Sequence, residues 1–221
     1  MLKLQFIVFA KAPVAGLAKT RLVPALGPVG AATLAERMLG HAVAACVGAQ
    51  AQLGHCGVEI CATPDAQHPA FHCLAEQHTG QHTATAPGLE LHTQGEGDLG
   101  ARMHRAFTRT LAHARGALLI GTDAPALDTA VLLQAAAALD EHDAVFVPAL
   151  DGGYALVGLR RPAPALFNGM AWSTPQVMAD TRDRARQASL HWAELPAVAD
   201  IDLPADLVLL PPGWLPAEPR P

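Results

Sequence analysis

The segment FIVFAKAPVAGLAKTRL, residues 6–22, joins an apolar run to a loop whose positive charge is not balanced locally. The loop carries Lys11, Lys19 and Arg21, and the segment contains no acidic residue, although the whole protein has a net charge of -5. Gly16 allows the backbone to approach a ligand closely, and lysine and arginine together can bond several oxygens. The segment therefore predicts a strand that leads into an anion-binding loop, with phosphate favoured over carboxylate. A solvated surface loop is the alternative interpretation.

The composition is typical of one globular domain. The chain has 221 residues, of which 51% are hydrophobic and 16% charged, enough to bury a sizeable core. We expect the domain to span residues 1–210, followed at 211–221 by a proline-rich tail without regular structure. The negative net charge argues against a nucleic-acid or membrane surface. No apolar run approaches the roughly 20 residues that span a bilayer, and no signal peptide is recognisable, which predicts a cytoplasmic location.

Apolar periodicity predicts strands and helices that alternate along the chain. The expected strands are residues 4–10, 58–62, 89–94, 117–122, 144–148, 154–159 and 190–195. The expected helices are residues 28–47, 69–77, 99–114, 129–141, 173–188 and 204–207. This alternation predicts a mostly parallel sheet covered on both faces, a three-layer α/β/α sandwich.

Acidic residues follow two of the predicted strands. Asp123 comes directly after the buried strand at 117–122, and Asp200 and Asp202 follow the last strand. The carboxyl edge of an open α/β sheet is where ligands bind, and one or two carboxylates with phosphate oxygens suit Mg²⁺. Asp128 is better placed than Asp123 to cap the next helix, which favours a metal-binding role for Asp123. Asp202 has two interpretations, a metal ligand beside Asp200 or the cap of the final helix.

The run from Gly95 to Gly100 matches the spacing G-x-G-x-x-G of a dinucleotide fingerprint. Asp123 lies about where such a site places its ribose-binding acid. Against this alternative, an NAD-type oxidoreductase, Glu96 and Asp98 would repel a bound pyrophosphate. We expect instead that Asp98 or Arg102 positions a base, a ribose or an acceptor.

A turn of unusual composition lies between two of the predicted strands. Asp151, Gly152 and Gly153 form a tight turn by their chemistry alone. Tyr154, the only tyrosine in the chain, follows at once and could stack on or bond a ligand. We therefore include all four residues among the predicted binding residues.

Six segments occur in an order and spacing that resemble a bacterial glycosyltransferase-like family. They are KAPVAGLAKTRL, GDLGARM, GTDAPAL, PALDGGYALVGL, AWST and DIDLPADL. The resemblance covers residues 6–207 and places the chain in the glycosyltransferase-A or nucleotide-diphospho-sugar transferase superfamily. It implies a Rossmann-like sheet of mixed strand direction that binds a nucleotide, and a metal aspartate at Asp123. The D-x-D metal motif of the superfamily is reduced here, because Ala124 and Pro125 follow Asp123.

The resemblance implies transfer from an activated nucleotide donor with Mg²⁺ or Mn²⁺. Lys19 and Asp123 would be the catalytic residues, the basic loop would neutralise the phosphates, and the acceptor would be a small molecule that the sequence does not identify. Glycosyl transfer from a nucleotide sugar is the first expectation. Because K-T-R-L also resembles the nucleotidyltransferase branch, including the guanylyltransferases, the second expectation is nucleotidyl transfer from a triphosphate to a small phosphorylated or acidic acceptor, with release of pyrophosphate. Oligomeric state is left open.

Overall fold

Seven strands of the described chain form a single sheet. A computed structural model describes residues 3–78 and 88–215. The strands are β1 (Leu4–Lys11), β2 (Cys56–Thr63), β3 (Glu90–Thr93), β4 (Ala117–Gly121), β5 (Ala144–Pro148), β6 (Tyr154–Leu159) and β7 (Trp192–Glu194). Their order across the sheet is β3-β2-β1-β4-β6-β5-β7. β6 pairs antiparallel with both of its neighbours, and the other pairings are parallel. The predicted mixed, mostly parallel sheet is confirmed.

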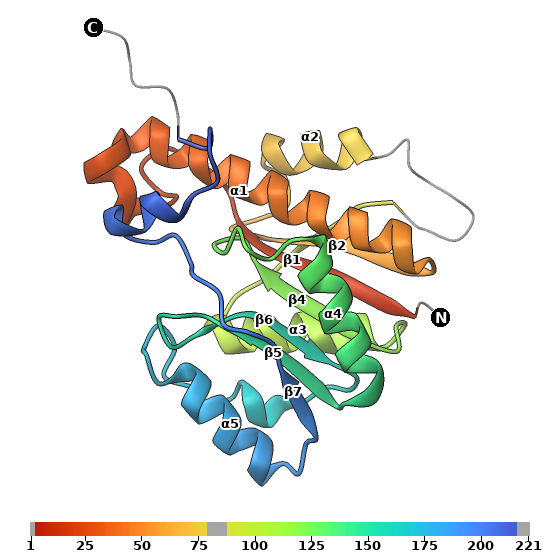
Figure 1. The fold of residues 1–221 in the computed structure, drawn as a ribbon. Helices are drawn as coiled ribbons and strands as arrows, with labels where there is room; N and C mark the ends of the chain where they lie inside the picture. The colour runs from red at the N-terminus through yellow and green to blue at the C-terminus, as the bar shows by residue number, and fades with distance from the viewer. Residues whose placement is uncertain (1–2, 79–87, 216–221) are drawn as a thin grey trace, which may run out of the picture.

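Helices cover both faces of this sheet (Figure 1). They are α1 (Val23–Leu53), α2 (Pro69–His78), α3 (Leu99–Leu111), α4 (Thr129–Glu141) and α5 (Val177–Gln187). One apolar cluster packs α1, α2 and α4 against one face, and a second cluster packs α3 and α5 against the other. The three-layer α/β/α architecture predicted from the alternating pattern is therefore confirmed.

β1 lies in the middle of the sheet and explains why the opening segment is so apolar. Phe6 and Val8 point into the cluster beneath α1 and α4, while Ile7 between them points into the cluster beneath α3. All three side chains are fully buried. A strand buried on both faces requires an uninterrupted apolar run, not an alternating one. β1 ends at Lys11, where the chain reaches solvent at the carboxyl edge of the sheet.

The antiparallel strand has a functional consequence. Because β6 runs opposite to β1 and β4, its first residue, Tyr154, lies at the same edge of the sheet as the last residues of the parallel strands. Residues that precede β6 in the sequence therefore join the loops that follow β1 and β4.

Two helix starts differ from prediction. α1 begins at Val23, and it is kinked where Gly27 takes a φ of 68°, so Pro28 begins the regular part of the helix. α5 begins at Val177, not at Ser173. Ser173 has a φ of 62°, and the Thr174 hydroxyl donates to the carbonyl of Ala171 instead of capping the helix.

The end of the chain also differs in part from the sequence-based expectation. Pro204–Leu209 forms a 3₁₀ segment, not an α-helix. Beyond it, Trp214 packs edge-on against His41, and Arg37 donates to the carbonyl of Gly213. The start of the proline-rich tail is thus held against α1 by an aromatic contact that composition does not reveal. Residues 216–221 of the predicted tail lie outside the described part of the chain.

Within the described ranges, no helix has both the length and the apolar character to cross a membrane, and this includes the 31-residue α1.

Candidate functional site

A cavity of about 680 Å³ opens at the carboxyl edge of the sheet, and we call it the carboxyl-edge cavity. Eight of the residues predicted from the sequence line it: Lys11, Lys19, Arg21, Arg102, Asp123, Asp151, Tyr154 and Asp202. They come from the ends of β1 and β4, from α3, from the start of β6 and from the C-terminal segment. The basic loop and the acidic residues thus meet in one place, as expected for residues that follow parallel strands.

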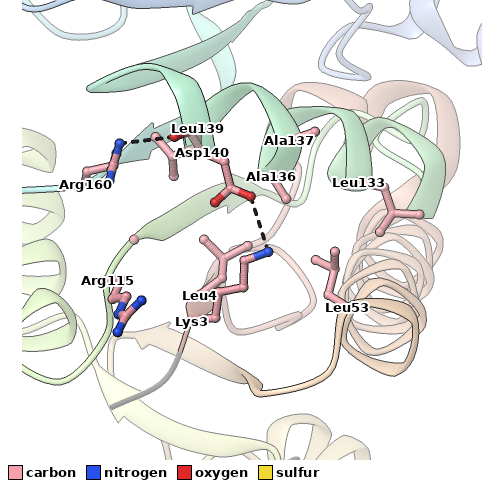
Figure 2. A pocket seen from close by; sticks show the side chains of 11 residues that line it. Lys3, Leu4, Leu53, Arg115, Leu133, Ala136, Ala137, Leu139, Asp140 and Arg160 are labelled. Atoms are coloured by element: carbon pink, nitrogen blue, oxygen red, sulfur yellow. Dashed lines mark hydrogen bonds and ion pairs between the residues drawn. The ribbon is translucent and has the colours of Figure 1, made fainter.

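A second cavity of about 310 Å³ lies at the opposite, amino edge of the sheet (Figure 2). We call it the amino-edge cavity. Its floor is apolar, and its charged residues are Lys3, Arg115, Asp140 and Arg160. Lys3 and Asp140 form an ion pair of 3.3 Å between two side chains that are half exposed or more. No residue predicted to be functional lines this cavity.

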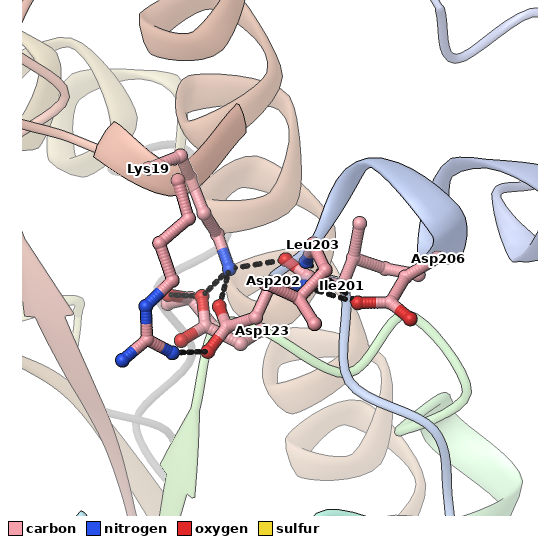
Figure 3. A network of polar contacts seen from close by, with 8 residues as sticks. Lys19, Asp123, Ile201, Asp202, Leu203 and Asp206 are labelled. Carbon is pink, nitrogen blue, oxygen red and sulfur yellow. Dashed lines mark hydrogen bonds and ion pairs between the residues drawn. The ribbon is translucent and has the colours of Figure 1, made fainter. Parts of the chain in front are cut away.

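Lys19 occupies the centre of the polar network in the carboxyl-edge cavity (Figure 3). Its Nζ lies 2.6 Å from Asp123 Oδ1 and 2.9 Å from Asp202 Oδ1, and it donates to the carbonyl of Ile201 at 2.6 Å. Its side chain is only 8% exposed. The backbone of Lys19 is left-handed, with φ and ψ both 46°, a conformation that costs a non-glycine residue about 1 to 3 kcal/mol. Such strain is typical of a residue that the surrounding structure holds for a function.

The environment of Lys19 keeps it charged. Burial disfavours the ammonium form, but the carboxylates of Asp123 and Asp202 outweigh burial, so the pKa of Lys19 is raised above its ordinary value. Arg21 adds a longer ion pair of 3.7 Å to the other oxygen of Asp202. The two carboxylates are therefore matched by two cations from the loop after β1.

The C-terminal segment that carries Asp202 is fixed by its backbone. The amide of Ile201 donates to the carbonyl of Asp123 at 2.8 Å, and the Ile201 side chain is 1% exposed in a cluster with residues of α1. The Asp206 carboxylate accepts from the amides of Asp202 and Leu203 at 3.0 and 2.6 Å (Figure 3). Asp206 is a positioning residue that the sequence interpretation missed. Its only signal in the sequence was its position, four residues after Asp202.

Asp200 does not join Asp123 and Asp202 in a three-carboxylate cluster within the described residues. The prediction assumed an extended backbone with Asp200 and Asp202 on one face, but this segment is not a strand. Burial, followed by the charge of Asp151, raises the pKa of Asp200. Asp200 therefore lies in the field of Asp151 and does not line the cavity.

Arg102 is held at the cavity by Gln94, a residue that the sequence interpretation missed. Gln94 is 3% exposed, and its amide nitrogen donates to the carbonyls of Ala10 and Cys61 at the ends of β1 and β2. Its amide oxygen accepts from Arg102 Nη1 at 2.9 Å. Because the side-chain nitrogen and oxygen of Gln94 are both hydrogen-bonded, the buried glutamine fixes the direction of the Arg102 guanidinium group. The signal of Gln94 in the sequence was a polar residue at the end of the expected strand 89–94, where a buried side chain needs hydrogen-bond partners.

The glycine-rich segment after β3 does not form a dinucleotide site. The carboxylate of Asp98 caps α3 by accepting from the amide of Ala101 at 2.8 Å, so it occupies the place where a pyrophosphate would bind. Arg105 crosses the segment and donates to the carbonyls of Gln94 and Glu96 at 2.6 and 2.9 Å. Asp98, predicted as a binding residue, is thus a helix cap and does not line the cavity.

The turn before β6 supplies one wall of the cavity. Asp151 accepts from the amide of Gly153 at 2.8 Å, and both Asp151 and Tyr154 line the cavity. The Tyr154 hydroxyl lies 3.9 Å from the sulfur of Met103, and burial raises its pKa. Gly152 has a φ of 94°, and a Cβ there would lie 2.1 Å from the carbonyl oxygen of Pro175. Gly152 is therefore required by the fold.

Five predicted residues do not line the cavity: Gly16, Asp98, Gly152, Gly153 and Asp200. Three residues that no prediction included do line it in one run, Ser173, Thr174 and Pro175. They were assigned to the start of a helix, and the later start of α5 leaves them to form part of the cavity wall.

The oxygens around Lys19 fit a hard divalent cation. Asp123 Oδ1, Asp202 Oδ1 and the carbonyl of Ile201 converge on one point, which the ammonium group occupies. Mg²⁺ and Mn²⁺ favour such oxygen-only donors, and Mg²⁺ sites commonly use one or two protein carboxylates.

A second acidic group lies elsewhere. Glu59, Glu90 and His92 offer ligand atoms within 4.8 Å of one another, the one such group of three among the described residues. Arg109 donates to both oxygens of the buried Glu59 at 2.5 and 2.8 Å. A cation placed there would compete with this ion pair. None of these residues lines the carboxyl-edge cavity.

The sheet order, the antiparallel β6 and the cavity at the carboxyl edge define the fold of the nucleotide-diphospho-sugar transferases. A protein of Desulfovibrio desulfuricans G20, assigned provisionally by its description to that class, matches with 29% identity and a TM-score of 0.77. The match covers 92% of this chain and 84% of that one. The chain belongs to the DUF2064 family, described as an uncharacterized protein conserved in bacteria, whose profile matches residues 44–174.

Two more distant structures share the fold alone. The 4-diphosphocytidyl-2C-methyl-D-erythritol synthase of Anaerococcus prevotii DSM 20548 is 9% identical, with a TM-score of 0.58 over 94% of this chain and 96% of that one. Rv0371c of Mycobacterium tuberculosis H37Rv, solved in complex with manganese, is 15% identical, with a TM-score of 0.50 over 94% and 97%. No curated protein sequence matches the chain.

Proposed function

We propose that the protein is a metal-dependent transferase that transfers the sugar of a nucleotide-diphospho-sugar bound in the carboxyl-edge cavity. The observation that carries this proposal is the Lys19 network, in which a buried ammonium and two carboxylates lie beside Lys11, Arg21 and Arg102. Cations at several points along one cavity suit a donor with several charged phosphate oxygens. The match to the Desulfovibrio desulfuricans protein supports the same class of donor.

Each group has a role that follows from its position. The cations of the loop after β1 neutralise the diphosphate, and Lys19 lies nearest to the carboxylates that would hold Mg²⁺ or Mn²⁺. Asp123 and Asp202 are those ligands, and the metal when bound stabilises negative charge on the departing diphosphate. Arg102, fixed by Gln94, binds the donor from the side of α3. Asp151 and the 173–175 wall face the acceptor.

In this reaction the bond between the anomeric carbon and the diphosphate oxygen breaks. A nucleoside diphosphate leaves, the acceptor oxygen forms the new bond to the anomeric carbon, and the acceptor proton passes to solvent or to a nearby carboxylate. The protein contributes by positioning and by charge stabilisation, because no side chain needs to form a covalent intermediate.

Nucleotidyl transfer is the second candidate, and one observation favours it. The second carboxylate comes from the C-terminal segment, not from a D-x-D motif next to Asp123, and Lys19 contacts both carboxylates directly. Three cations in one loop suit a triphosphate. There the bond between the α-phosphorus and its bridging oxygen would break, pyrophosphate would leave, and the acceptor oxygen would bond to the α-phosphorus.

A thermal-shift panel tests the proposal. The purified protein is mixed with the four nucleoside triphosphates, common nucleotide sugars and NAD(P), each with and without Mg²⁺ or Mn²⁺. Saturation at about 100 times Kd stabilises by roughly 2.7 kcal/mol, which is about 5 to 10 °C for a domain of this size. A metal-dependent shift with a nucleotide sugar is expected, and a shift with a triphosphate alone would select the second candidate. A response to NAD(P) alone, or to no nucleotide, would contradict the proposal.

A further inference from the structure

The Lys19 ammonium is held by the same oxygens that fit a metal ion. Its three acceptors, Asp123 Oδ1, Asp202 Oδ1 and the carbonyl of Ile201, lie 2.6 to 2.9 Å from Nζ (Figure 3). An ammonium donates three hydrogen bonds, so Lys19 is satisfied by these acceptors. A divalent cation and Lys19 cannot occupy this point together, since both carry positive charge and both need the same oxygens.

The two segments that carry these oxygens are held together by bonds that do not involve Lys19. The bond from the Ile201 amide to the Asp123 carbonyl fixes the two segments to each other. Asp206 fixes the amides on either side of the Asp202 side chain, and the buried Ile201 side chain anchors the segment to α1. If the ammonium leaves, the backbone of both segments stays in place, so the two carboxylates and the Ile201 carbonyl remain close together as an acidic site.

Lys19 leaves its carboxylates most readily when another anion receives it. Its side chain is 8% exposed, and a buried ammonium without a partner is strongly unfavourable. Lys19 also lines the carboxyl-edge cavity, and its four-carbon stem lets Nζ move without movement of the backbone. The oxygens of a phosphate bound in that cavity are anionic acceptors of the kind that the Lys19 ammonium needs.

We propose that Lys19 competes with a divalent cation for the Asp123–Asp202 oxygens, and that nucleotide phosphates open this site by drawing the ammonium toward themselves. The nucleotide and the metal then bind cooperatively, and the empty protein binds free divalent cations more weakly than the nucleotide-bound protein does. This inference rests on the proposed function for the identity of the anion, but the competition itself is a property of the protein and the metal alone.

The first test measures Mn²⁺ binding to the nucleotide-free protein by electron paramagnetic resonance of free Mn²⁺. Lys19→Met keeps the length and apolar stem of the side chain and removes the charge. It is expected to raise the Mn²⁺ affinity by about 10-fold, within the usual range of coupling between sites. Asp123→Asn added to Lys19→Met is expected to remove this gain. A Lys19→Met protein with the affinity of the wild type would overturn the inference.

Two further variants guard the result. Lys19→Gly removes the same charge and suits the left-handed backbone, so it replaces Lys19→Met if that variant does not fold. Lys11→Met removes a cation from the same loop that donates to the carbonyl of Leu17 and contacts neither carboxylate. Lys11→Met is expected to leave Mn²⁺ affinity unchanged. An equal gain in Lys11→Met would mean that net charge, not competition, sets the affinity, and the inference would be wrong.

The second test uses calorimetry with UDP-glucose and GTP, each without metal. Lys19→Met is expected to weaken binding of whichever ligand the wild type binds by about 10-fold or more, because the phosphates lose the ammonium. Unchanged binding would show that the phosphates do not draw the Lys19 ammonium toward them, and the inference would be wrong. If the thermal-shift panel finds no nucleotide ligand with or without metal while Lys19→Met still gains Mn²⁺ affinity, the competition stands and the proposed function fails.

Discussion

The two cavities lie at opposite edges of one sheet, and both carry lysine and arginine side chains, yet they differ in how those charges are held. At the amino edge, the side chains of Lys3 and Asp140 are 50% and 62% exposed (Figure 2). At the carboxyl edge, Lys19 is 8% exposed and bonded to three oxygens. Exposed ion pairs contribute about 0 to 1 kcal/mol, whereas a buried, fully bonded charge is fixed in position. The presence of charges therefore does not distinguish the two cavities, whereas the burial and bonding of those charges do.

The largest expected effect is a loss of turnover when a carboxylate is neutralised at the carboxyl edge but not at the amino edge. Asp123→Asn is expected to lower turnover of the donor found in the thermal-shift panel by about 100-fold or more, because it removes a ligand from the site of developing charge. The matched control is Asp140→Asn at the amino edge, which should leave turnover unchanged. The assay is the release of nucleoside diphosphate or pyrophosphate at saturating metal. Equal activity of Asp123→Asn and wild type would remove the carboxyl-edge cavity as the active site.

The second prediction compares one glycine from each edge. Gly152→Ala forces a Cβ onto the backbone of Pro175 at a φ of 94°, which we expect to cost about 2 to 4 kcal/mol. Thermal unfolding should then shift down by roughly 5 to 15 °C. At the amino edge, a Cβ on Gly116 meets the ends of two leucine side chains at 3.2 and 3.3 Å, which can move. Gly116→Ala should therefore cost less than about 1 kcal/mol.

Melting curves of the two glycine variants, recorded without ligand, check this difference. If both variants melted at the temperature of the wild type, the wall built by Gly152 and Pro175 would be more plastic than its geometry indicates. A loss in Gly116→Ala as large as that in Gly152→Ala would show that the amino edge is packed as rigidly as the carboxyl edge.

The third prediction concerns Gln94 and Arg102. Gln94→Leu frees the Arg102 guanidinium, and donor affinity is expected to fall by about 10-fold, the usual size for one hydrogen bond to a charged group. Arg102→Ala should produce the same loss or a larger one, and the double variant should add nothing to Arg102→Ala. Calorimetric titration of the donor measures all three. Additive losses would mean that Gln94 supports only the strand ends at Ala10 and Cys61.

Local patterns were enough to predict most of the fold and the placement of Asp123. The apolar run of β1 and the run that ends at Asp123 are long enough to mark buried strands. Because the ends of parallel strands share an edge of the sheet, the sequence predicted that Lys19 and Asp123 lie close together. The two side chains form an ion pair in the structure. The start of α5 was predicted wrongly because serine and threonine are common N-cap residues of helices. In the structure, Ser173 and Thr174 precede the helix and line the cavity.

The sequence predicted that Lys19 and Asp202 lie near the same edge of the sheet, but not that the two side chains bond directly. Lys19 and Asp202 are 183 residues apart, and no periodicity relates them. The spacing of Asp200 and Asp202 suggested a shared face, but only the tertiary bond of Ile201 decides which of the two carboxylates meets Lys19. Gln94 was missed for the same reason, because the three partners of its side chain belong to two other strands and a helix.

The smallest effect is expected at the amino edge. Arg115 is exposed, and its side chain makes no hydrogen bond or ion pair with the residues that the structure describes. Arg115→Ala should therefore change stability by no more than about 0.5 kcal/mol and leave donor affinity and turnover as in the wild type. Urea unfolding and the turnover assay used for Asp123→Asn check both parts. A clear loss of turnover in Arg115→Ala would show that an exposed and unfixed charge can serve the reaction, and the distinction between the two edges would then rest on position alone.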